Sequence, residues 1–210
     1  MTIRDSAQAQ YRPARLSPQI ITLVKKATAG QRSAFNQLID HYQNAIMRMV
    51  YYRVRIQMDA EDLTQEIFFK AYRNISRLKD PERFRSWLFS IAINRVRDYY
   101  RKNKFLKLFG ALPEKEATVS QNKALAYDSK VHENLLKQEF WQQVSNALDI
   151  LSPKEREVFL LRFFDQLSLK EISQTLQKSE STVKTHLYRA LSKFKKERSI
   201  TILLGNGQNK

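Results

Sequence analysis

The sequence predicts an all-α protein with two small helical domains joined by a flexible linker. Apolar residues recur at intervals of three and four along most of the chain, as in amphipathic helices, and the apolar-polar alternation typical of strands is missing. Three helix starts with capping chemistry follow one another between residues 151 and 196. Residues 105–130 shift to Ala, Ser, Gln and Lys, with Gly110 and Pro113, which is typical of a linker.

The chain divides into five predicted segments. Residues 1–17 are polar, contain Arg4, Arg12 and Arg15, and predict a mobile basic tail. The first helical domain is predicted over residues 18–103, the linker over 104–132, the second domain over 133–198 and a C-terminal tail over 199–210. The second domain is expected to begin with an amphipathic helix over residues 133–150.

The first domain is expected to contain four helices. Two amphipathic helices are predicted between Ile20 and Val54, separated by a break at Gly30. A third is expected to begin with Asp59 as its N-cap and Asp62 at its third position. The Asp80-Pro81 pair then predicts a loop over residues 76–85. The pattern resumes as a helix expected to bury Phe84, Trp87, Leu88, Ile91 and Ala92.

An acidic cluster lies on the third predicted helix. Asp59, Glu61, Asp62 and Glu66 fall within eight residues of a chain that is otherwise basic. Two interpretations remain open. The carboxylates stabilise the helix N-terminus through the macrodipole, or Asp62, Gln65 and Glu66 form a surface that meets a basic protein partner.

The fourth predicted helix is cationic. Between residues 95 and 107, six Lys or Arg residues stand against a single Asp98. Cations that follow phosphates, together with aromatic rings that hold unstacked bases, suit single-stranded nucleic acid. The aromatic residues could equally belong to the core, as we expect for Trp87, and this alternative stays open for Phe89 and Tyr100. The outer side of this helix carries Asn94, Arg97, Asp98 and Arg101.

Residues 151–196 predict a helix-turn-helix. Ser152 and Ser168 each precede a glutamate by three residues, which is the pattern of a capping box, and Ser179 is expected to cap the last helix. Only Gln177 and Lys178 separate that cap from the preceding helix, so the last helix could enter a major groove. The alternative is a helical bundle with a solvated basic face. The predicted buried stripe of the last helix contains Val183, Leu187, Ala190, Leu191 and Phe194, and its free face carries Glu180, Ser181, Lys184, Thr185, Tyr188 and Arg189.

The composition points to a polyanionic partner. The chain has 37 Lys and Arg against 21 Asp and Glu, a net charge of +16, so nucleic acid is the first candidate and an anionic membrane surface the second. It has no cysteine, and its three histidines lack the spacing of metal ligands. No phosphate-binding glycine loop, membrane span or signal peptide is recognisable. We therefore expect a cytoplasmic protein with no catalytic residues, metal or cofactor.

Five stretches in a fixed order carry a resemblance to a known family: AFNQLIDHY, DAEDLTQEIFFKAYRNI, FRSWLFSIAINRVRDYY, LSPKEREVFLLRFFDQLSLKEIS and STVKTHLYRAL. Together the chain resembles a bacterial RNA polymerase sigma factor of the sigma-70 family, of the two-domain extracytoplasmic-function (ECF) type. The resemblance covers about residues 18–103 and 133–197. It implies a sigma-2-like domain followed by a sigma-4-like domain with the helix-turn-helix.

The resemblance also implies a function and its residues. Such a factor binds RNA polymerase core through the largest-subunit coiled coil and the flap, captures melted bases of the −10 promoter element, and reads the −35 element as duplex. It works in the cytoplasm, at the nucleoid, through the polymerase, and an anti-sigma factor is a possible further partner. The implied core-binding residues are Asp62, Gln65, Glu66 and Phe69; those for −10 are Arg77, Lys79, Arg83, Arg85, Asn94, Arg97 and Arg101; those for −35 are Ser181, Thr182, Lys184, Thr185, Tyr188 and Arg189.

This chain departs from the family pattern at two turns. Gln166 and Gln177 stand where the family often has glycine, and Lys178 stands at a position that is usually apolar, so those turns could differ locally. One rival function is a helix-turn-helix regulator that binds operators without polymerase. It would leave the acidic and cationic helices of the first domain unexplained. A metal-dependent nuclease using Asp59, Asp62 and Glu66 is the other rival, but these carboxylates lie on one helix without convergent ligands elsewhere.

Overall fold

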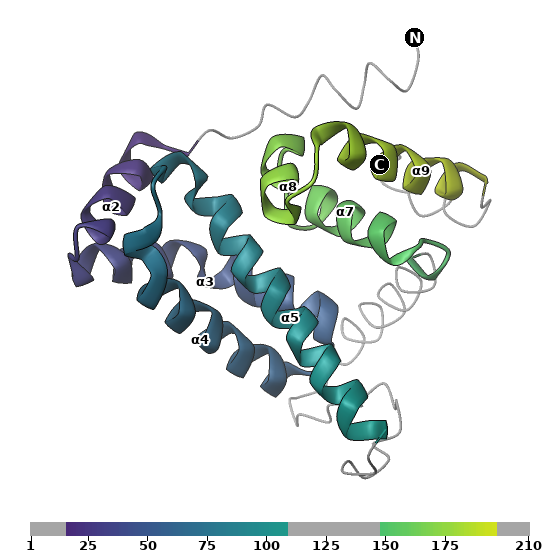
Figure 1. Ribbon diagram of the computed structural model, residues 1–210, viewed down its shortest axis with the longest axis horizontal. Coiled ribbons are helices and arrows are strands. Elements are labelled where there is room, and N and C mark those ends of the chain that lie inside the picture. The colour runs from purple at the N-terminus through teal and green to yellow at the C-terminus, as the bar shows by residue number, and fades with distance from the viewer. Residues whose placement is uncertain (1–15, 109–147, 197–210) are drawn as a thin grey trace, which may run out of the picture.

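The computed structural model describes residues 16–108 and 148–196, and every regular element in these ranges is a helix (Figure 1). This confirms the all-α prediction. The N-terminal part contains α2 (Pro18–Thr28), α3 (Arg32–Val54), α4 (Gln57–Asn74) and α5 (Phe84–Leu108), with the 3-10 turns η1 (Ile75–Arg77) and η2 (Pro81–Arg83). The C-terminal part contains α7 (Pro153–Phe163), α8 (Leu169–Leu176) and α9 (Glu180–Lys196). The predicted linker and most of the predicted helix over residues 133–150 lie outside the described residues.

Local sequence explains most helix ends. Ser17 caps α2 by accepting a hydrogen bond from the Ile20 amide, with Pro18 at the first position. Gly30 adopts φ 93°, a left-handed conformation that lets the chain turn between α2 and α3. Both predicted capping boxes are present, at Ser152 with Glu155 and at Ser168 with Glu171.

The prediction for the start of α4 was wrong. The helix begins at Gln57 with Ile56 as N-cap, so Asp59 lies inside the first turn and Asp62 farther along the helix. Asp59 does not cap because its carboxylate accepts a hydrogen bond of 2.6 Å from the Tyr99 hydroxyl of α5. The tertiary contact therefore uses the side chain that the sequence assigned to the cap.

Most of the predicted loop over residues 76–85 is also regular. It forms η1 and η2, and Asp80 caps η2 by accepting from the Glu82 amide at 3.0 Å. These short turns bring the chain directly into α5, whose first residue, Phe84, is buried. The start of α5 is therefore held in a defined place.

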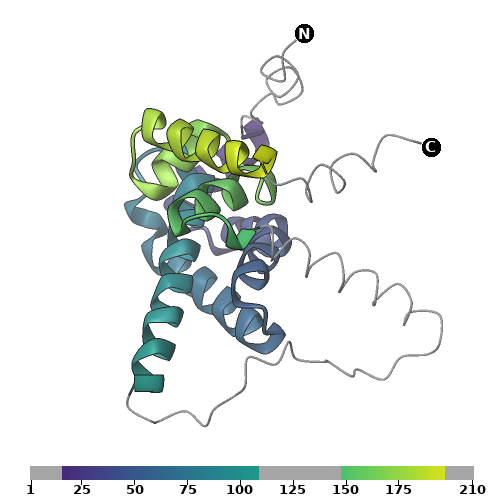
Figure 2. The same ribbon diagram turned by 90° about the vertical axis from the view of Figure 1, so that its right-hand side faces the viewer.

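The apolar core does not stop at the boundary between the two halves of the chain. A cluster built on α2 to α5 includes Phe35, Leu38, Phe84 and Phe89, and it continues into Leu161, Leu167, Ile172, Val183 and Leu187 of the C-terminal helices. A smaller cluster of Leu148, Leu151, Leu160, Ala190 and Phe194 lies between α7 and α9. Helix α8 accordingly packs beside α5, as both views show (Figures 1 and 2). Among the described helices, none is long and apolar enough to cross a bilayer.

The aromatic residues left open by the sequence divide between core and surface. Phe89 is fully buried, and Trp87 is partly buried against the core. Tyr100 is about half exposed, and its hydroxyl donates to the backbone carbonyl of Arg53. On α9, the expected buried stripe is right except at Leu191, which is exposed.

Candidate functional site

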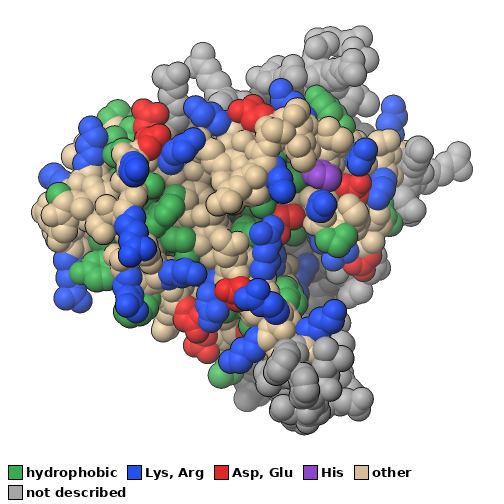
Figure 3. All heavy atoms as spheres, in the orientation of Figure 1, with side chains coloured by type: hydrophobic (Ala, Val, Ile, Leu, Met, Phe, Trp, Pro, Cys, Tyr) green, Lys and Arg blue, Asp and Glu red, His purple; other side chains and the backbone are tan. Residues whose placement is uncertain are grey.

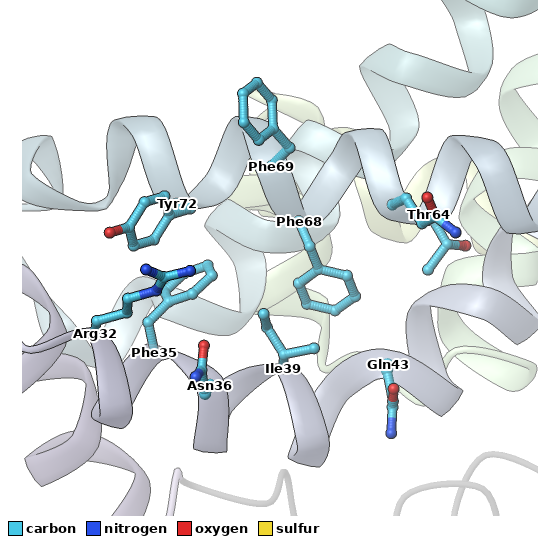
Figure 4. A pocket seen from close by; sticks show the side chains of 10 residues that line it. Arg32, Phe35, Asn36, Ile39, Gln43, Thr64, Phe68, Phe69 and Tyr72 are labelled. Carbon is cyan, nitrogen blue, oxygen red and sulfur yellow. The ribbon is translucent and has the colours of Figure 1, made fainter.

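A groove between α3 and α4 holds two of the residues expected to contact polymerase (Figure 4). Its volume is about 400 Å³. Phe68 points down toward Ile39 of α3, whereas Phe69 points away from α3, and its side chain is 63% exposed. We call this site the α3–α4 groove; it is lined by Arg32, Phe35, Asn36, Ile39, Gln43, Thr64, Gln65, Phe68, Phe69 and Tyr72.

The aromatic end of the α3–α4 groove was not predicted. Phe35 and Tyr72 stack at a ring-centroid distance of 5.1 Å, and Tyr72 remains 46% exposed. The Arg73 guanidinium lies 5.6 Å from the centre of the Phe69 ring. Exposed aromatic rings with polar neighbours are typical of the centre of a protein interface. Sequence reasoning missed the α3 wall because its periodicity indicated only a core helix.

The four expected core-binding residues do not share one environment. Gln65 and Phe69 line the α3–α4 groove, and Asp62 is exposed on the same helix. Glu66 is not among the lining residues, and its carboxylate pairs with Arg95 of α5. The acidic cluster is thus shared between a free surface and contacts that hold α4 to α5.

Six of the seven residues expected to contact the −10 element have exposed side chains. Arg83 is paired loosely with Asp80 at 3.7 Å, and Arg101 with Asp98 at 2.9 Å, both at the surface. Lys and Arg side chains are spread over the face on which α4 and α5 lie (Figure 3). Such a face can follow a phosphate backbone. The six are Arg77, Lys79, Arg83, Asn94, Arg97 and Arg101.

The seventh residue, Arg85, faces the C-terminal helices. Its guanidinium lies 3.3 Å from a carboxylate oxygen of Glu171 and donates to the backbone carbonyls of Asp165, at 2.9 Å, and Gln166, at 3.2 Å. Its side chain is 18% exposed. The guanidinium is therefore committed to the other half of the chain.

The tyrosines on α5 have structural roles. Burial, assisted by the hydrogen bond to Asp59, raises the pKa of Tyr99 to about 12. Burial also raises the pKa of Tyr100, against the opposing charges of Arg55 and Arg53. Both hydroxyls have protein acceptors, so these rings tie α5 to the ends of α4 and α3.

The helix-turn-helix is built on a left-handed turn. Gln177 adopts φ 52°, and its amide donates to the carbonyls of Ser173 and Gln174. Gln166, before α8, likewise adopts φ 56°. Both turns thus keep the conformation in which glycine is favoured, although neither residue is glycine. Lys178 is exposed beside the second turn.

The free face of α9 carries the expected −35 residues. Ser181, Lys184, Thr185, Tyr188 and Arg189 are all exposed. Thr182 differs because its amide and hydroxyl both contact the Ser179 hydroxyl, at 3.2 Å and 2.8 Å, so it belongs to the helix cap. Lys and Arg donors on a helix held out by a turn can reach guanine acceptors in a major groove.

The carboxylates proposed for the nuclease alternative do not form a metal site. Asp59 bonds to Tyr99 and Glu66 pairs with Arg95. Across residues 16–108 and 148–196, no group of three His, Cys, Asp or Glu side chains is placed to hold a metal ion. The described carboxylates of α4 instead make contacts between helices or face solvent.

Comparisons with known proteins agree with this geometry. Residues 38–105 match the model of Sigma-70 region 2, and residues 141–194 match that of Sigma-70 region 4. The chain is 31% identical to the RNA polymerase sigma factor SigV of Bacillus subtilis over 169 residues, which span 80% of this chain and 92% of SigV.

Two further relatives extend the comparison. The chain is 34% identical to the ECF RNA polymerase sigma factor BldN of Streptomyces coelicolor over 181 residues, which are 83% of this chain but 64% of BldN. The solved structure of CnrH, in complex with the cytosolic domain of CnrY, is 23% identical in sequence. It matches 90% of this chain and 99% of its own with a TM-score of 0.62, which supports the shared fold.

Proposed function

The chain belongs to the ECF sigma factors of the sigma-70 family, and we propose that it docks on core RNA polymerase through the α3–α4 groove. The observation that carries this proposal is the groove itself, where exposed Phe69 and Tyr72 lie beside Gln65 and close to Asp62 on one helix. A basic coiled-coil surface of the polymerase would pair with Asp62 and cover the aromatic rings.

The two remaining surfaces divide promoter recognition between them. The exposed cations of η1, η2 and α5 hold the phosphates of the separated strand at −10, and Asn94 contacts a base there. The free face of α9 reads the −35 duplex through Lys184, Tyr188 and Arg189. Capture of a flipped base offsets the few kcal/mol that unstacking costs, so melting is driven by binding. The chain itself supplies no catalytic group, and the polymerase forms the RNA.

The setting of this activity follows from the partner. The protein works where the polymerase and the chromosome are, in the cytoplasm, and it requires no cofactor or metal. An anti-sigma factor that covers the α3–α4 groove would keep it from the polymerase. The exposed aromatic residues of the groove would serve either partner.

A transcription assay with purified core polymerase tests the proposal. Wild-type protein should convert random initiation into initiation at selected promoters. A stand-alone regulator would instead bind its DNA tightly without core and leave the start sites of core unchanged. That outcome would contradict the proposed function.

The substitution Asp62→Lys tests the docking surface. It reverses the charge at the edge of the α3–α4 groove and should weaken core binding by roughly 1–3 kcal/mol, which is a common cost for an interface residue. Binding is measured by fluorescence anisotropy of labelled protein against core. Asp149→Lys is the matched control, because Asp149 is exposed and pairs only with Arg156 of its own domain. Equal losses in the two variants would remove Asp62 from the interface.

A further inference from the structure

Polar contacts join the start of α5 to the C-terminal domain. Besides the contacts of Arg85 with Glu171 and the α7–α8 turn, the Ser86 hydroxyl lies 2.8 Å from Oε1 of Gln174. The Thr175 hydroxyl donates to the Ser86 carbonyl at 3.2 Å. Ser86 and Thr175 are both buried. These five residues, Arg85, Ser86, Glu171, Gln174 and Thr175, form what we call the α5–α8 interface.

A second set of contacts closes the same two halves along α7. Arg53, at the end of α3, lies 3.0 Å from Asp165 and 3.2 Å from Glu157. The other oxygen of Glu157 lies 3.7 Å from Arg97 of α5. Burial opposes the charge on Arg53, but Asp165 and Glu157 outweigh it and raise the pKa of the guanidinium. Buried charges of this kind are stable only while they stay paired.

These contacts fall on the surface that the single strand would need. Arg85 and Arg97 are both among the residues expected to hold the −10 strand. In the closed chain Glu171 and Glu157 accept from them, and a carboxylate offers a guanidinium the same paired acceptors as a phosphate. A strand cannot reach Arg85 while Glu171 and the α7–α8 turn are in place, and its phosphates would be repelled by both carboxylates.

The polymerase-binding surface is left open by the same arrangement. Every residue that lines the α3–α4 groove comes from α3 or α4, and none comes from the C-terminal helices. The closed chain therefore covers one function and leaves the other accessible.

We propose that this closed arrangement is autoinhibitory, with the C-terminal domain as occupant of the −10 face and Glu157 and Glu171 in the places of strand phosphates. The inference rests on the proposed function for the meaning of that face. Core polymerase binds the closed chain first through the α3–α4 groove, and separation of the two domains then frees Arg85 and Arg97 for DNA. Apparent affinity for single strand in the free protein is lowered by the fraction of chains that are open.

A cysteine pair can lock the closed state, because the chain has no cysteine of its own. Ser86→Cys with Thr175→Cys places two thiols across the α5–α8 interface, where oxidation or a short bismaleimide joins them. The probe is a fluorescent single-stranded DNA of random sequence, since phosphate contacts do not depend on sequence. The cross-linked protein should bind it roughly fivefold or more weakly than the same protein before cross-linking. Core binding should stay within about twofold, since the groove is uncovered.

The opposite change should open the chain. Glu157→Lys places a cation against Arg53 and Arg97, and should raise single-strand affinity roughly threefold or more over the control. Asp149→Lys again serves as control, because it adds the same charge to the same domain without facing α3 or α5. It corrects for the general gain of affinity that any added cation gives.

The outcomes separate this inference from the proposed function. Equal single-strand binding by the locked and unlocked protein, or by Glu157→Lys and Asp149→Lys, would overturn autoinhibition even if wild-type protein directs promoter-specific initiation. If the locked protein loses single-strand binding but wild-type protein gives no promoter-specific initiation with core, closure stands and the proposed function fails. A double-cysteine variant that fails to fold leaves the Glu157→Lys comparison to decide.

Discussion

Arginine side chains in this protein fall into two groups that the sequence does not distinguish. Arg83 and Arg101 lie at the surface with loose or local partners, whereas Arg53 and Arg85 are enclosed by acceptors from the other half of the chain. A surface pair is worth little and yields to a phosphate without much loss. An enclosed pair must be broken before the guanidinium can bind anything else.

Two cations on α9 should differ in what they read. If Lys184 contacts a base, Lys184→Ala should cost roughly 1–3 kcal/mol at the −35 element and relax specificity at one position. Binding of holoenzyme to a set of −35 variants measures it, and the same comparison applies to Arg189→Ala. Lys195→Ala, at the far end of the same helix, is the control. A uniform loss over all sequences would indicate a phosphate contact instead.

Glu155 should make the C-terminal domain sensitive to acid. Hydrogen bonds from Lys193 and from the Ser152 amide lower the pKa of Glu155 from 4.5 to about 2. Because the folded pKa lies below the unfolded one, the stabilisation is complete above pH 4.5 and is lost as the pH falls from 4.5 toward 2. The half-exposed Lys193 weakens the pair, so the expected loss is about 1 kcal/mol.

The variant Glu155→Gln tests this acid sensitivity. Glutamine at this position still accepts from the Ser152 amide, so the capping box is kept while the charge is removed. Urea unfolding of the full chain at several pH values should show a shallower loss of stability between pH 4.5 and 2 in the variant. Parallel curves for the two proteins would exclude Glu155 as the titrating group.

Among the elements, the turns around α8 carry a cost that natural substitution could remove. Gln166 and Gln177 hold left-handed backbone that a side chain disfavours. Capping boxes, the left-handed end of α8 and the Ser179 cap nevertheless produce a complete helix-turn-helix within about 30 residues. Local chemistry at both ends of α8 outweighs the backbone strain.

Glycine at the end of α8 should stabilise the domain. Gln177→Gly relieves the left-handed strain and should raise the free energy of unfolding by about 0.5–1 kcal/mol, less any extra entropy of the unfolded chain. Thermal unfolding followed by circular dichroism measures it. Gln177→Val is the opposing variant, since a β-branched residue is least compatible with this φ. A destabilising glycine would mean that the glutamine side chain makes a stabilising contact.

For the whole molecule, the main feature is that two family domains share one apolar cluster and one buried ionic network. The domains can therefore be stable together or separately, and the ionic network at Arg53 couples the choice to electrostatics. Burial raises the pKa of Asp165 although Arg53 pairs with it, which is typical of a carboxylate that would be better solvated if the domains parted.

Removal of Arg53 should open the molecule more than it unfolds it. Arg53→Met leaves Asp165 without its cation, and a buried pair broken in this way costs about 3–5 kcal/mol while the carboxylate stays buried. Separation of the domains returns Asp165 to water, so the chain should expand instead. Small-angle scattering should show a larger radius of gyration, and hydrogen exchange should quicken along α8.

The control for this experiment is Lys26→Met, an equal loss of charge on exposed α2. A variant that stays as compact as wild type but loses several kcal/mol of stability would show that the two domains cannot part. That result would also argue against a closed state that opens on polymerase.

Much of the fold could be read from local pattern. Helical periodicity, the two capping boxes and the two-residue spacing before Ser179 depend on neighbours within four residues, so they predicted the helices and the helix-turn-helix. The exposed face of α9 followed from the same periodicity. The start of α4 was mistaken because Asp59 takes a partner on α5, forty residues away.

The sequence by itself determined the helices, their caps, the basic character of α5 and the two recognition surfaces, because each depends on short-range chemistry. Only the tertiary structure decided that α3 supplies half of the groove beside Phe69, that Arg85 faces Glu171, and that α8 packs on α5. These contacts join residues up to 112 positions apart, such as Arg53 and Asp165. Periodicity shows which face of a helix is buried but not which helix covers it, so these pairings depend on the three-dimensional packing.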